Sequence, residues 1–235
     1  MCWRREFSRG SNAERINEFE GSGFASQVIN SWAPEQLRAV SDFDTRHQIN
    51  SNWIWEMPFG EGKKWAYHGL ANAVLGGWQL SGLFRWSSGL PFTIGPGLGF
   101  WATSWQLTSS AILNGPAPQT GTFIDSNGNP NVFKDPAAAD AAFRFAHPGE
   151  SGQRNALRGP GYFGIDSALS KTWKITESKN LSFRWEVFNI TNSVRFDVGT
   201  MSFDNGSIST ASTLGRFTQT LTRPRIMQFA LRFAF

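Results

Sequence analysis

The last eleven residues, 225–235, constrain the fold most strongly, because large apolar side chains occupy every second position there. The apolar positions are Met227, Phe229, Leu231, Phe233 and Phe235. The intervening positions are small or polar, except for one isoleucine, and a period of two predicts a β-strand. A tilted strand of about ten residues spans a bilayer, with lipid on its apolar face and a polar interior on the other. We therefore predict a transmembrane strand. The alternative is an ordinary C-terminal strand on a soluble core.

Four earlier segments alternate in the same way, and together they predict an all-β protein. The expected strands lie near 46–57, 77–91, 162–174, 181–194 and 224–235. Their bulky apolar positions share one face, while the opposite face is polar or small. The predicted fold is an antiparallel transmembrane β-barrel segment of about five long strands from a larger barrel, with long extracellular loops.

Charged and aromatic residues orient these strands. Arg184 and Glu186 share the polar face, and a charge on the lipid side would cost roughly 2–4 kcal/mol at the membrane midplane. We therefore assign that face to the barrel interior. Trp78, Trp86 and Trp173 stand near strand ends, where tryptophans of membrane barrels form interfacial girdles. They are predicted to be membrane-interface aromatics.

The connections divide into long and short ones. Residues 1–44 are expected to be mainly extracellular loop, and 45–235 to form the barrel region. Segments 92–160 and 192–223 are predicted on the cell exterior, and 58–76 and 175–180 in the periplasm, because short turns of such barrels lie inside. The segment 92–160 is expected to be one long loop without regular structure, apart from a strand or hairpin within Phe100–Leu113. Short helices are expected within Ala33–Val40, Lys63–Leu75 and Pro136–Phe145.

Composition argues against several other classes of function. The charge of +4 comes from Lys and Arg residues that are scattered along the chain and not gathered into a run, so we expect no nucleic-acid partner. His47, His68 and His147 lack metal-ligand spacing, and Cys2 is the single cysteine. Residues from Asp125 onward resemble the start of a calcium loop, but the distal Glu is missing, so a turn is predicted. No catalytic set, cofactor motif or run of about 18 apolar residues occurs, so we expect no enzyme, no cofactor and no transmembrane helix.

The N-terminal sequence lacks the apolar segment of a secretory signal peptide. A chain destined for an outer membrane needs export. We therefore expect this chain to be the C-terminal piece of a longer protein.

Six short motifs carry a resemblance to a known family. They are SDFDTRH (41–47), GGWQLSG (76–82), SGLPF (88–92), NALRGPG (155–161), EVFNITN (186–192) and the aromatic end at Phe235. In this order they resemble the C-terminal barrel region of TonB-dependent outer-membrane receptors. The group they are most similar to is the Oar-like group, with a carboxypeptidase-regulatory-like N-terminal domain. The likeness covers about residues 41–235.

The resemblance implies a location in the bacterial outer membrane and uptake of an unidentified ligand. It implies a barrel of about 22 strands plugged by an N-terminal domain. The implied partners are the TonB complex, which would act through a missing N-terminal region, the barrel-assembly machinery and outer-membrane lipid. The alternative function is a soluble or secreted carbohydrate-binding module, in which Trp101 and Trp105 would stack on sugar rings.

The terminal strand is also predicted to act as an assembly signal. The resemblance implies that the barrel-assembly machinery recognises an alternating aromatic C-terminus. The stripe that would be recognised comprises Phe229, Leu231, Phe233 and Phe235. In the alternative, Phe235 only packs against lipid and a neighbouring strand.

Overall fold

The computed structural model describes residues 30, 32–60, 62–65, 69–96, 109–201, 206–208 and 211–235. The chain folds into two compact units, each built from three stretches of sequence. The strand unit comprises Gln48–Trp86, Phe163–Arg195 and Thr222–Phe235. The loop unit comprises the described part of Met1–His47 together with Ser87–Tyr162 and Phe196–Leu221. The predicted division into 1–44 and 45–235 stays a prediction, because most of 1–44 lies outside the described residues.

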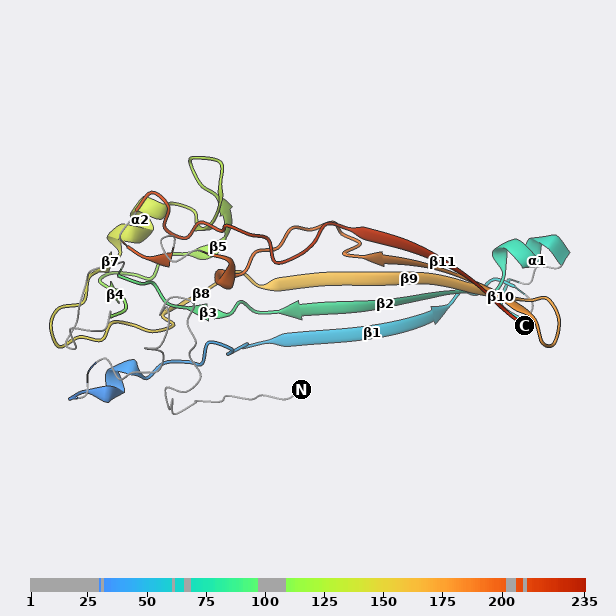
Figure 1. The fold of residues 1–235 in the computed structure, drawn as a ribbon, viewed down its shortest axis with the longest axis horizontal. Helices are drawn as coiled ribbons and strands as arrows, with labels where there is room; N and C mark the ends of the chain where they lie inside the picture. Colours follow the sequence, from blue (N-terminus) through green and yellow to red (C-terminus); the bar gives the residue numbers. More distant parts are fainter. Residues whose placement is uncertain are drawn as a thin grey trace. The chain divides into compact units, whose positions relative to one another are not determined.

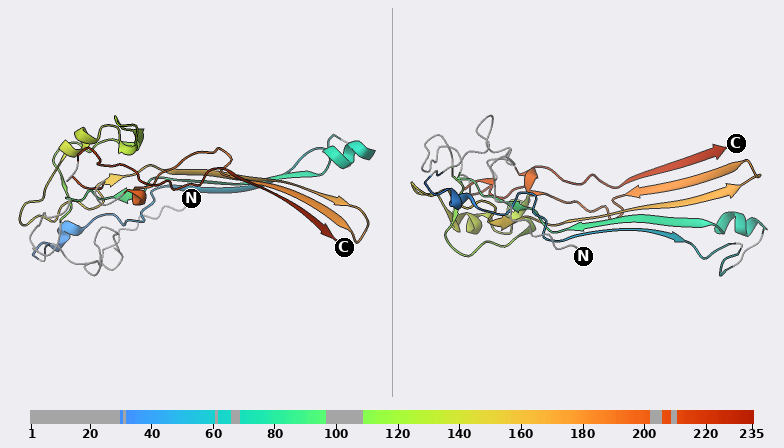
Figure 2. Two further views of the ribbon diagram at one scale, coloured as in Figure 1. Left: turned by 45° about the horizontal axis from the view of Figure 1, so that its top comes forward. Right: turned by 90° about the horizontal axis from the view of Figure 1, so that it is seen from below.

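The strand unit is a five-stranded sheet in the order β1-β2-β9-β10-β11. Its strands are β1 (Gln48–Glu56), β2 (Trp78–Ser87), β9 (Tyr162–Lys174), β10 (Asn180–Phe188) and β11 (Ile226–Ala234). Neighbouring arrows point in opposite directions in Figures 1 and 2, so the sheet is antiparallel. The predicted all-β fold with five long strands is confirmed.

The register of the sheet brings the predicted apolar positions onto one face. Phe183 of β10 lies opposite Leu231 of β11, and Trp185 lies opposite Phe229. On the other side of β10, Trp185 lies opposite Leu169 of β9. Side chains alternate between the two faces along each strand. Because the paired positions are apolar, every second residue of the three strands contributes to one continuous apolar surface.

The strand connections leave the sheet at its two ends in an ordered way. Segments 57–77 and 175–179 and the C-terminus lie at one end of the strands, and segments 88–161 and 189–225 leave from the other. Short connections therefore share one end with the C-terminus.

Two strands end earlier than predicted, each for a visible reason. β10 stops at Phe188 instead of continuing to 194, because Asn189 adopts a φ of 51°, outside the extended region. β2 stops at Ser87 instead of 91, because Pro91–Phe92 (β3) pairs with Leu157–Arg158 (β8) in a separate two-stranded sheet.

The three expected helical segments each contain a helix. They are η2, a 3-10 turn at Pro34–Leu37, α1 at Gly69–Leu75 and α2 at Pro136–Ala141. α2 begins where it does because the Asp135 carboxylate accepts hydrogen bonds from the backbone N–H groups of Ala137 and Ala138. Another short 3-10 turn, η3, follows at Val198–Thr200. Within the described part of the chain, no helix has both the length and the hydropathy to cross a membrane.

The expectation of an excursion without regular structure over 92–160 is wrong. This stretch contains β3, β8 and α2, as well as β4 (Ile112–Leu113) paired with β7 (Phe143–Arg144) and β5 (Thr120–Ile124) paired with β6 (Pro130–Phe133). The strand expected within Phe100–Leu113 is β4, and residues 100–108 lie outside the described residues.

The loop unit has its own hydrophobic core. It is formed by Phe92, Ile94, Ala111, Val132, Phe133, Ala139, Phe143, Leu157, Met201, Ile208, Leu214 and Phe217. Residues from 92–157 and 201–217 therefore bury their apolar side chains together. The two segments predicted as separate loops fold into one body.

Candidate functional site

Aromatic rings contact one another, in T-shaped and stacked pairs, along the apolar face of the strand unit. Trp78 contacts Trp173 and Phe183, with ring centroids 6.4 Å and 6.0 Å apart. Trp185 stacks on Phe229 at 5.9 Å. Such pairs contribute about 0.5–1.5 kcal/mol each beyond the area they bury. The apolar face is therefore a continuous aromatic surface and not a set of isolated side chains.

Gly82 shows why a glycine interrupts the apolar face of β2. A Cβ atom built on Gly82 would lie 2.1 Å from the Trp53 ring, so the indole from β1 packs directly against the bare backbone of β2. Any larger side chain would push Trp53 away from the sheet. The motif that contains Gly82 thus has a packing role.

The predicted assembly residues lie on one face of β11, at the edge of the described sheet. Phe229 and Leu231 are 67% and 69% exposed, and Phe235 is 93% exposed. Among the residues that the structure describes, the Phe235 ring contacts the ring of Phe233, at 6.1 Å. A stripe this apolar and this exposed needs lipid or another strand to cover it.

The predicted interface tryptophans separate into two groups. Trp78 and Trp173 meet at the end of the sheet that holds the C-terminus, whereas Trp86 lies near the opposite end of β2. Their position at the membrane interface stays a prediction.

Lys171 is a site residue that sequence reasoning missed. It lies opposite Phe183, on the apolar face, and it is only 4% exposed. Its ammonium lies 5.5 Å and 5.2 Å from the ring centroids of Trp78 and Trp173, within cation–π range. The signal was present in the sequence, because Lys171 shares the parity of Leu169 and Trp173.

The polar face carries two groups of charged side chains. Arg184 Nε donates to Glu186 Oε1 at 2.6 Å, and Gln228 Nε2 donates to the other carboxylate oxygen of Glu186. Arg85 forms an ion pair of 2.9 Å with Asp166. The sequence placed Arg184 and Glu186 on one face, and the structure shows in addition that they form an ion pair.

Asn189 joins the ends of β9, β10 and β11. Its backbone N–H donates to Asp166 Oδ1 at 2.9 Å, and its side-chain amide donates to the carbonyl oxygens of Ser193 and Arg223, at 3.1 Å and 3.0 Å. Its left-handed φ of 51° is one that asparagine tolerates better than most residues. Asn192, with a φ of 49°, similarly accepts from the backbone N–H of Arg225. The EVFNITN motif is therefore a strand-ending device.

We predict that Asn189→Ala destabilises the strand unit by about 1–2 kcal/mol, because it leaves two carbonyl oxygens without their hydrogen-bond donor and disfavours the left-handed backbone. Asn189→Gly removes the same side-chain bonds but keeps the conformation, so its loss is expected to be smaller. The measurement uses samples of the full-length protein that are heated to increasing temperatures and then run on a gel without boiling. The temperature at which the band of folded protein disappears is compared between the variants. Equal losses in both variants would contradict a role for the backbone conformation.

In the loop unit, two distant motifs form a network of charged and polar side chains. Arg154 pairs with Asp42 at 2.8 Å, and Arg158 pairs with Asp44. Asn155, at a φ of 54°, donates from its amide to Asp42 Oδ1 at 2.6 Å and to a backbone carbonyl. The SDFDTRH and NALRGPG motifs thus bind each other, and we call Asp42, Asp44, Arg154, Asn155 and Arg158 the motif junction.

The third motif of the loop unit, SGLPF, reaches the same junction. Arg158 Nη1 donates to the carbonyl oxygen of Gly89, at 3.2 Å. Thr93, the residue after the motif, donates from Oγ1 to Asn155 Oδ1, at 3.1 Å. A Cβ atom on Gly89 would lie 1.8 Å from the Gly159 carbonyl oxygen. The close crossing of these two segments therefore requires glycine at position 89.

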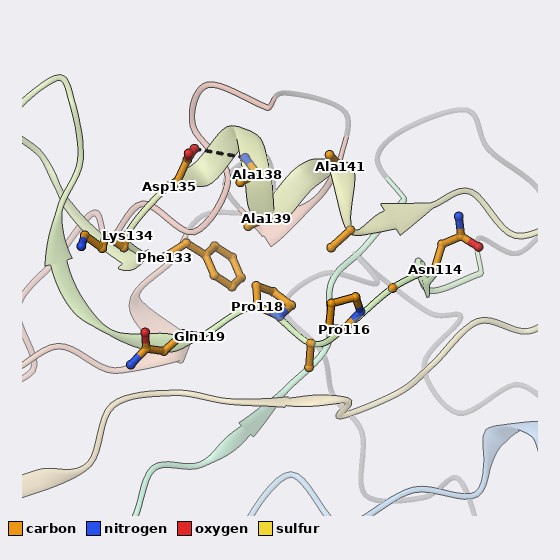
Figure 3. A pocket seen from close by; sticks show the side chains of 13 residues that line it. Asn114, Pro116, Pro118, Gln119, Phe133, Lys134, Asp135, Ala138, Ala139 and Ala141 are labelled. Atoms are coloured by element: carbon orange, nitrogen blue, oxygen red, sulfur yellow. Dashed lines mark hydrogen bonds between the residues drawn. The ribbon is translucent and has the colours of Figure 1, made fainter.

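A cavity of about 500 Å³ lies between α2 and the segment 114–119 of the loop unit. In Figure 3 the ring of Phe133 points toward Pro118, and α2 passes above them with Ala138 and Ala139. The Asp135 carboxylate is directed at the start of α2, where it caps the helix. The lining is mostly Pro, Ala and Phe, which suits a small apolar group.

The segment that resembles a calcium loop is a hairpin turn between β5 and β6. Asp125 Oδ1 accepts from the backbone N–H groups of Asn127 and Asn129, both at 2.9 Å. The bond from Asn129 is the main reason that the pKa of Asp125 is lowered. The predicted turn is confirmed. Among the described residues, no cluster of three or more His, Cys, Asp or Glu side chains has metal-site geometry.

Glu150, in the loop unit, is a carboxyl group whose pKa is strongly lowered by its hydrogen bonds. The guanidinium of Arg144 donates two hydrogen bonds to it, at 2.8 Å and 3.0 Å, and the His147 N–H donates a third, at 2.7 Å. These bonds, chiefly that from Arg144, lower the pKa of Glu150 from 4.5 to about 2.

Because the folded-state pKa of Glu150 is depressed, its stabilisation is present above the unfolded value of 4.5 and disappears as the pH falls toward about 2. We predict that Glu150→Gln lowers the melting temperature of the protein at pH 6, and that the difference from wild type vanishes near pH 2. Melting curves of both proteins across this range test the prediction. A difference that persists unchanged at the lowest pH would contradict it.

Long antiparallel strands with one aromatic face and one polar, ion-paired face define the class of membrane-spanning β-proteins. A family model described as an outer membrane beta barrel domain matches residues 5–228. The chain belongs to this family, and its location is the outer membrane. Comparisons with curated proteins and with solved structures gave no match.

Proposed function

We propose that the chain is the C-terminal part of a TonB-dependent outer-membrane receptor of the Oar-like group, which takes up a ligand across the outer membrane. The observation that carries this proposal is the motif junction. Three of the six motifs that resemble this group bind one another there through Asp42, Asp44, Asn155, Arg158 and Gly89, and Arg154, directly before one of the motifs, adds an ion pair with Asp42. Motifs that form one interaction network support descent from a common fold better than motifs with unrelated roles.

In this proposal the strand unit supplies part of the barrel wall. An open sheet edge in lipid would leave backbone groups unpaired, so the remaining strands must come from the rest of a longer protein. The proposed partners are the TonB complex, the barrel-assembly machinery, outer-membrane lipid and an unidentified ligand. The proposal assigns no enzymatic activity and no cofactor to the chain.

The gene upstream of Met1 tests the receptor proposal. We expect it to encode a plug domain and a carboxypeptidase-regulatory-like domain in the same reading frame. The full-length product should then bind the purified periplasmic domain of TonB in a pull-down, and deletion of the N-terminal region through which the TonB complex would act should abolish that binding. An upstream sequence without a plug would refute the receptor proposal and leave the outer-membrane barrel intact.

We further predict that the loop unit faces the cell exterior and that the short connections face the periplasm. Single cysteines at Asn127, in the β5–β6 turn, and at Glu177, in the β9–β10 turn, form a matched pair, because both residues are exposed. With Cys2→Ser as background, a membrane-impermeant maleimide should label Asn127→Cys on intact cells and Glu177→Cys only after the outer membrane is opened. Labelling in the reverse order would invert the topology.

The soluble carbohydrate-binding alternative is at odds with the outer-membrane family. Its proposed stacking residues, Trp101 and Trp105, lie outside the described residues.

A further inference from the structure

Helix α1 is fixed to the apolar face of the sheet by side chains from two strands. It lies at the end of the strand unit that also holds the C-terminus (Figure 1). The indole N–H of Trp173 donates to the Ala73 carbonyl oxygen at 2.6 Å, and that of Trp78 donates to the Val74 carbonyl oxygen at 2.8 Å. Lys171 Nζ donates to the carbonyl oxygens of Asn72 and Val74, at 3.3 Å and 3.2 Å.

These three side chains satisfy the end of the helix. The last carbonyls of a helix have no partner within it, and a cation there is favourable because of the helix dipole. Trp78, Trp173 and Lys171 all project from the apolar face of the sheet, so they hold α1 against the face that meets lipid. The ammonium and both indoles are amphipathic groups that suit the boundary between hydrocarbon and headgroups.

The outer side of α1 is apolar and exposed. Leu70, Val74 and Leu75 are 87%, 64% and 50% exposed, and the helix sequence GLANAVL contains no charged residue. Leu70 and Val74 are four positions apart, so they form one stripe along the helix. A helix exposed to water on this side would carry polar residues there.

We propose that α1 is an interfacial membrane anchor, whose Leu70, Val74 and Leu75 side chains insert into the phospholipid leaflet at the C-terminal end of the barrel wall. The occupant of this surface is lipid because the stripe adjoins, through Trp78 and Trp173, the apolar face of an outer-membrane barrel domain. Insertion covers the exposed leucines and valine without ordering a further partner. It also keeps Lys171 at the membrane boundary, where its charge is tolerated, instead of in the hydrocarbon.

The anchor would fix the depth of the barrel in the membrane. The carbonyl end of α1 is bonded to residues at one level of β2 and β9, so the helix axis and the girdle tryptophans share that level. A shift of the barrel wall along the membrane normal would then move α1 into the hydrocarbon or out into water. This anchor is independent of the receptor proposal, because it requires only an outer-membrane barrel.

Spin-label accessibility tests the anchor in the full-length protein, reconstituted in vesicles of phosphatidylethanolamine and phosphatidylglycerol. With Cys2→Ser as background, single labels are placed at Val74, at Leu231 as the lipid-facing reference and at Glu177 as the water-facing reference. We expect the label at Val74 to behave like that at Leu231, with collisions with oxygen exceeding those with a water-soluble nickel chelate. The ratio should be reversed at Glu177.

Two other results would overturn the proposal. A label at Val74 that matches the one at Glu177 would put the helix in water. Spin–spin broadening at Val74 that disappears on dilution with unlabelled protein would show that a second copy, not lipid, covers the stripe.

A positioning variant tests the role of Lys171 without removing the tryptophans. Lys171→Met keeps the volume and loses the donor, and it should shift the Val74 label toward the nickel chelate while leaving the Leu231 label unchanged. Lys171→Arg should restore the wild-type ratio. If the Met variant left the Val74 ratio unchanged, Lys171 would not position the helix.

Discussion

Deleting Phe235 from the full-length protein is expected to reduce its outer-membrane level to a small fraction of wild type, with the remainder degraded in the periplasm. The terminal stripe of Phe229, Leu231, Phe233 and Phe235 is exposed along one face of β11, and Phe235 is its most exposed member, at 93%. We propose that the barrel-assembly machinery recognises this stripe before the strands pair. Immunoblots of separated outer-membrane and periplasmic fractions give the measurement.

The packing alternative predicts a much smaller effect. The Phe235 ring has one described ring contact, with Phe233, and such a contact contributes about 0.5–1.5 kcal/mol. Loss of this contact would lower the melting temperature of the inserted protein, but the amount of protein in the outer membrane would stay near the wild-type level. Phe235→Tyr keeps an aromatic terminus and serves as the control, so it should insert normally. Normal insertion after the deletion would leave only the packing role.

The strands could be predicted from the sequence because their pattern is local. The alternation of apolar and polar residues in 162–174 and 224–235 predicted β9 and β11 to within two residues at each end. The assignment of Arg184 and Glu186 to the polar face followed from the same alternation, since a charge in lipid is costly. Their ion pair is visible only in the structure. The end of β10 was placed too late, because the left-handed backbone at Asn189 leaves little trace in a hydrophobic pattern.

The loop unit could not be predicted because its core is built from residues distant in the sequence. Phe133 and Leu214 are both almost fully buried in it, although each lies in a segment with many turn residues. The junction of Asp42 with Arg154 likewise joins residues 112 positions apart. Short strands such as β4 and β7 take their conformation from this tertiary packing and carry no periodic signal of their own.

Lys171 shows a different limit. Its position on the apolar face was available from the parity of β9, but the partners that make it tolerable there were not. Its hydrogen-bond acceptors are carbonyl oxygens of α1, about 100 positions away in sequence, as the bond to Asn72 at a separation of 99 shows. A charged residue at a position that faces lipid in the alternation therefore indicates that a second element covers the strand there.

The lipid-facing assignment of β11 leads to the second large effect, a charge placed on its apolar face. Phe229→Arg is expected to destabilise the folded barrel by about 2–4 kcal/mol, since Phe229 lies near the middle of β11 and an arginine at the membrane midplane has that cost. The substitution also removes the ring stacked on Trp185 at 5.9 Å. Urea titration of the full-length protein in lipid vesicles, followed by tryptophan fluorescence, measures the loss.

Gln228→Arg is the matched control, because it introduces the same side chain one residue away on the opposite face. Gln228 lies opposite Glu186, so an arginine there gains a carboxylate partner and should change stability by less than about 0.5 kcal/mol. The comparison holds the new residue, the strand and the depth nearly constant and changes only the face. If the two variants lost equal stability, the apolar face of β11 would not be the one that meets lipid. The assignment of strand faces from the alternation of apolar and polar residues would then be wrong.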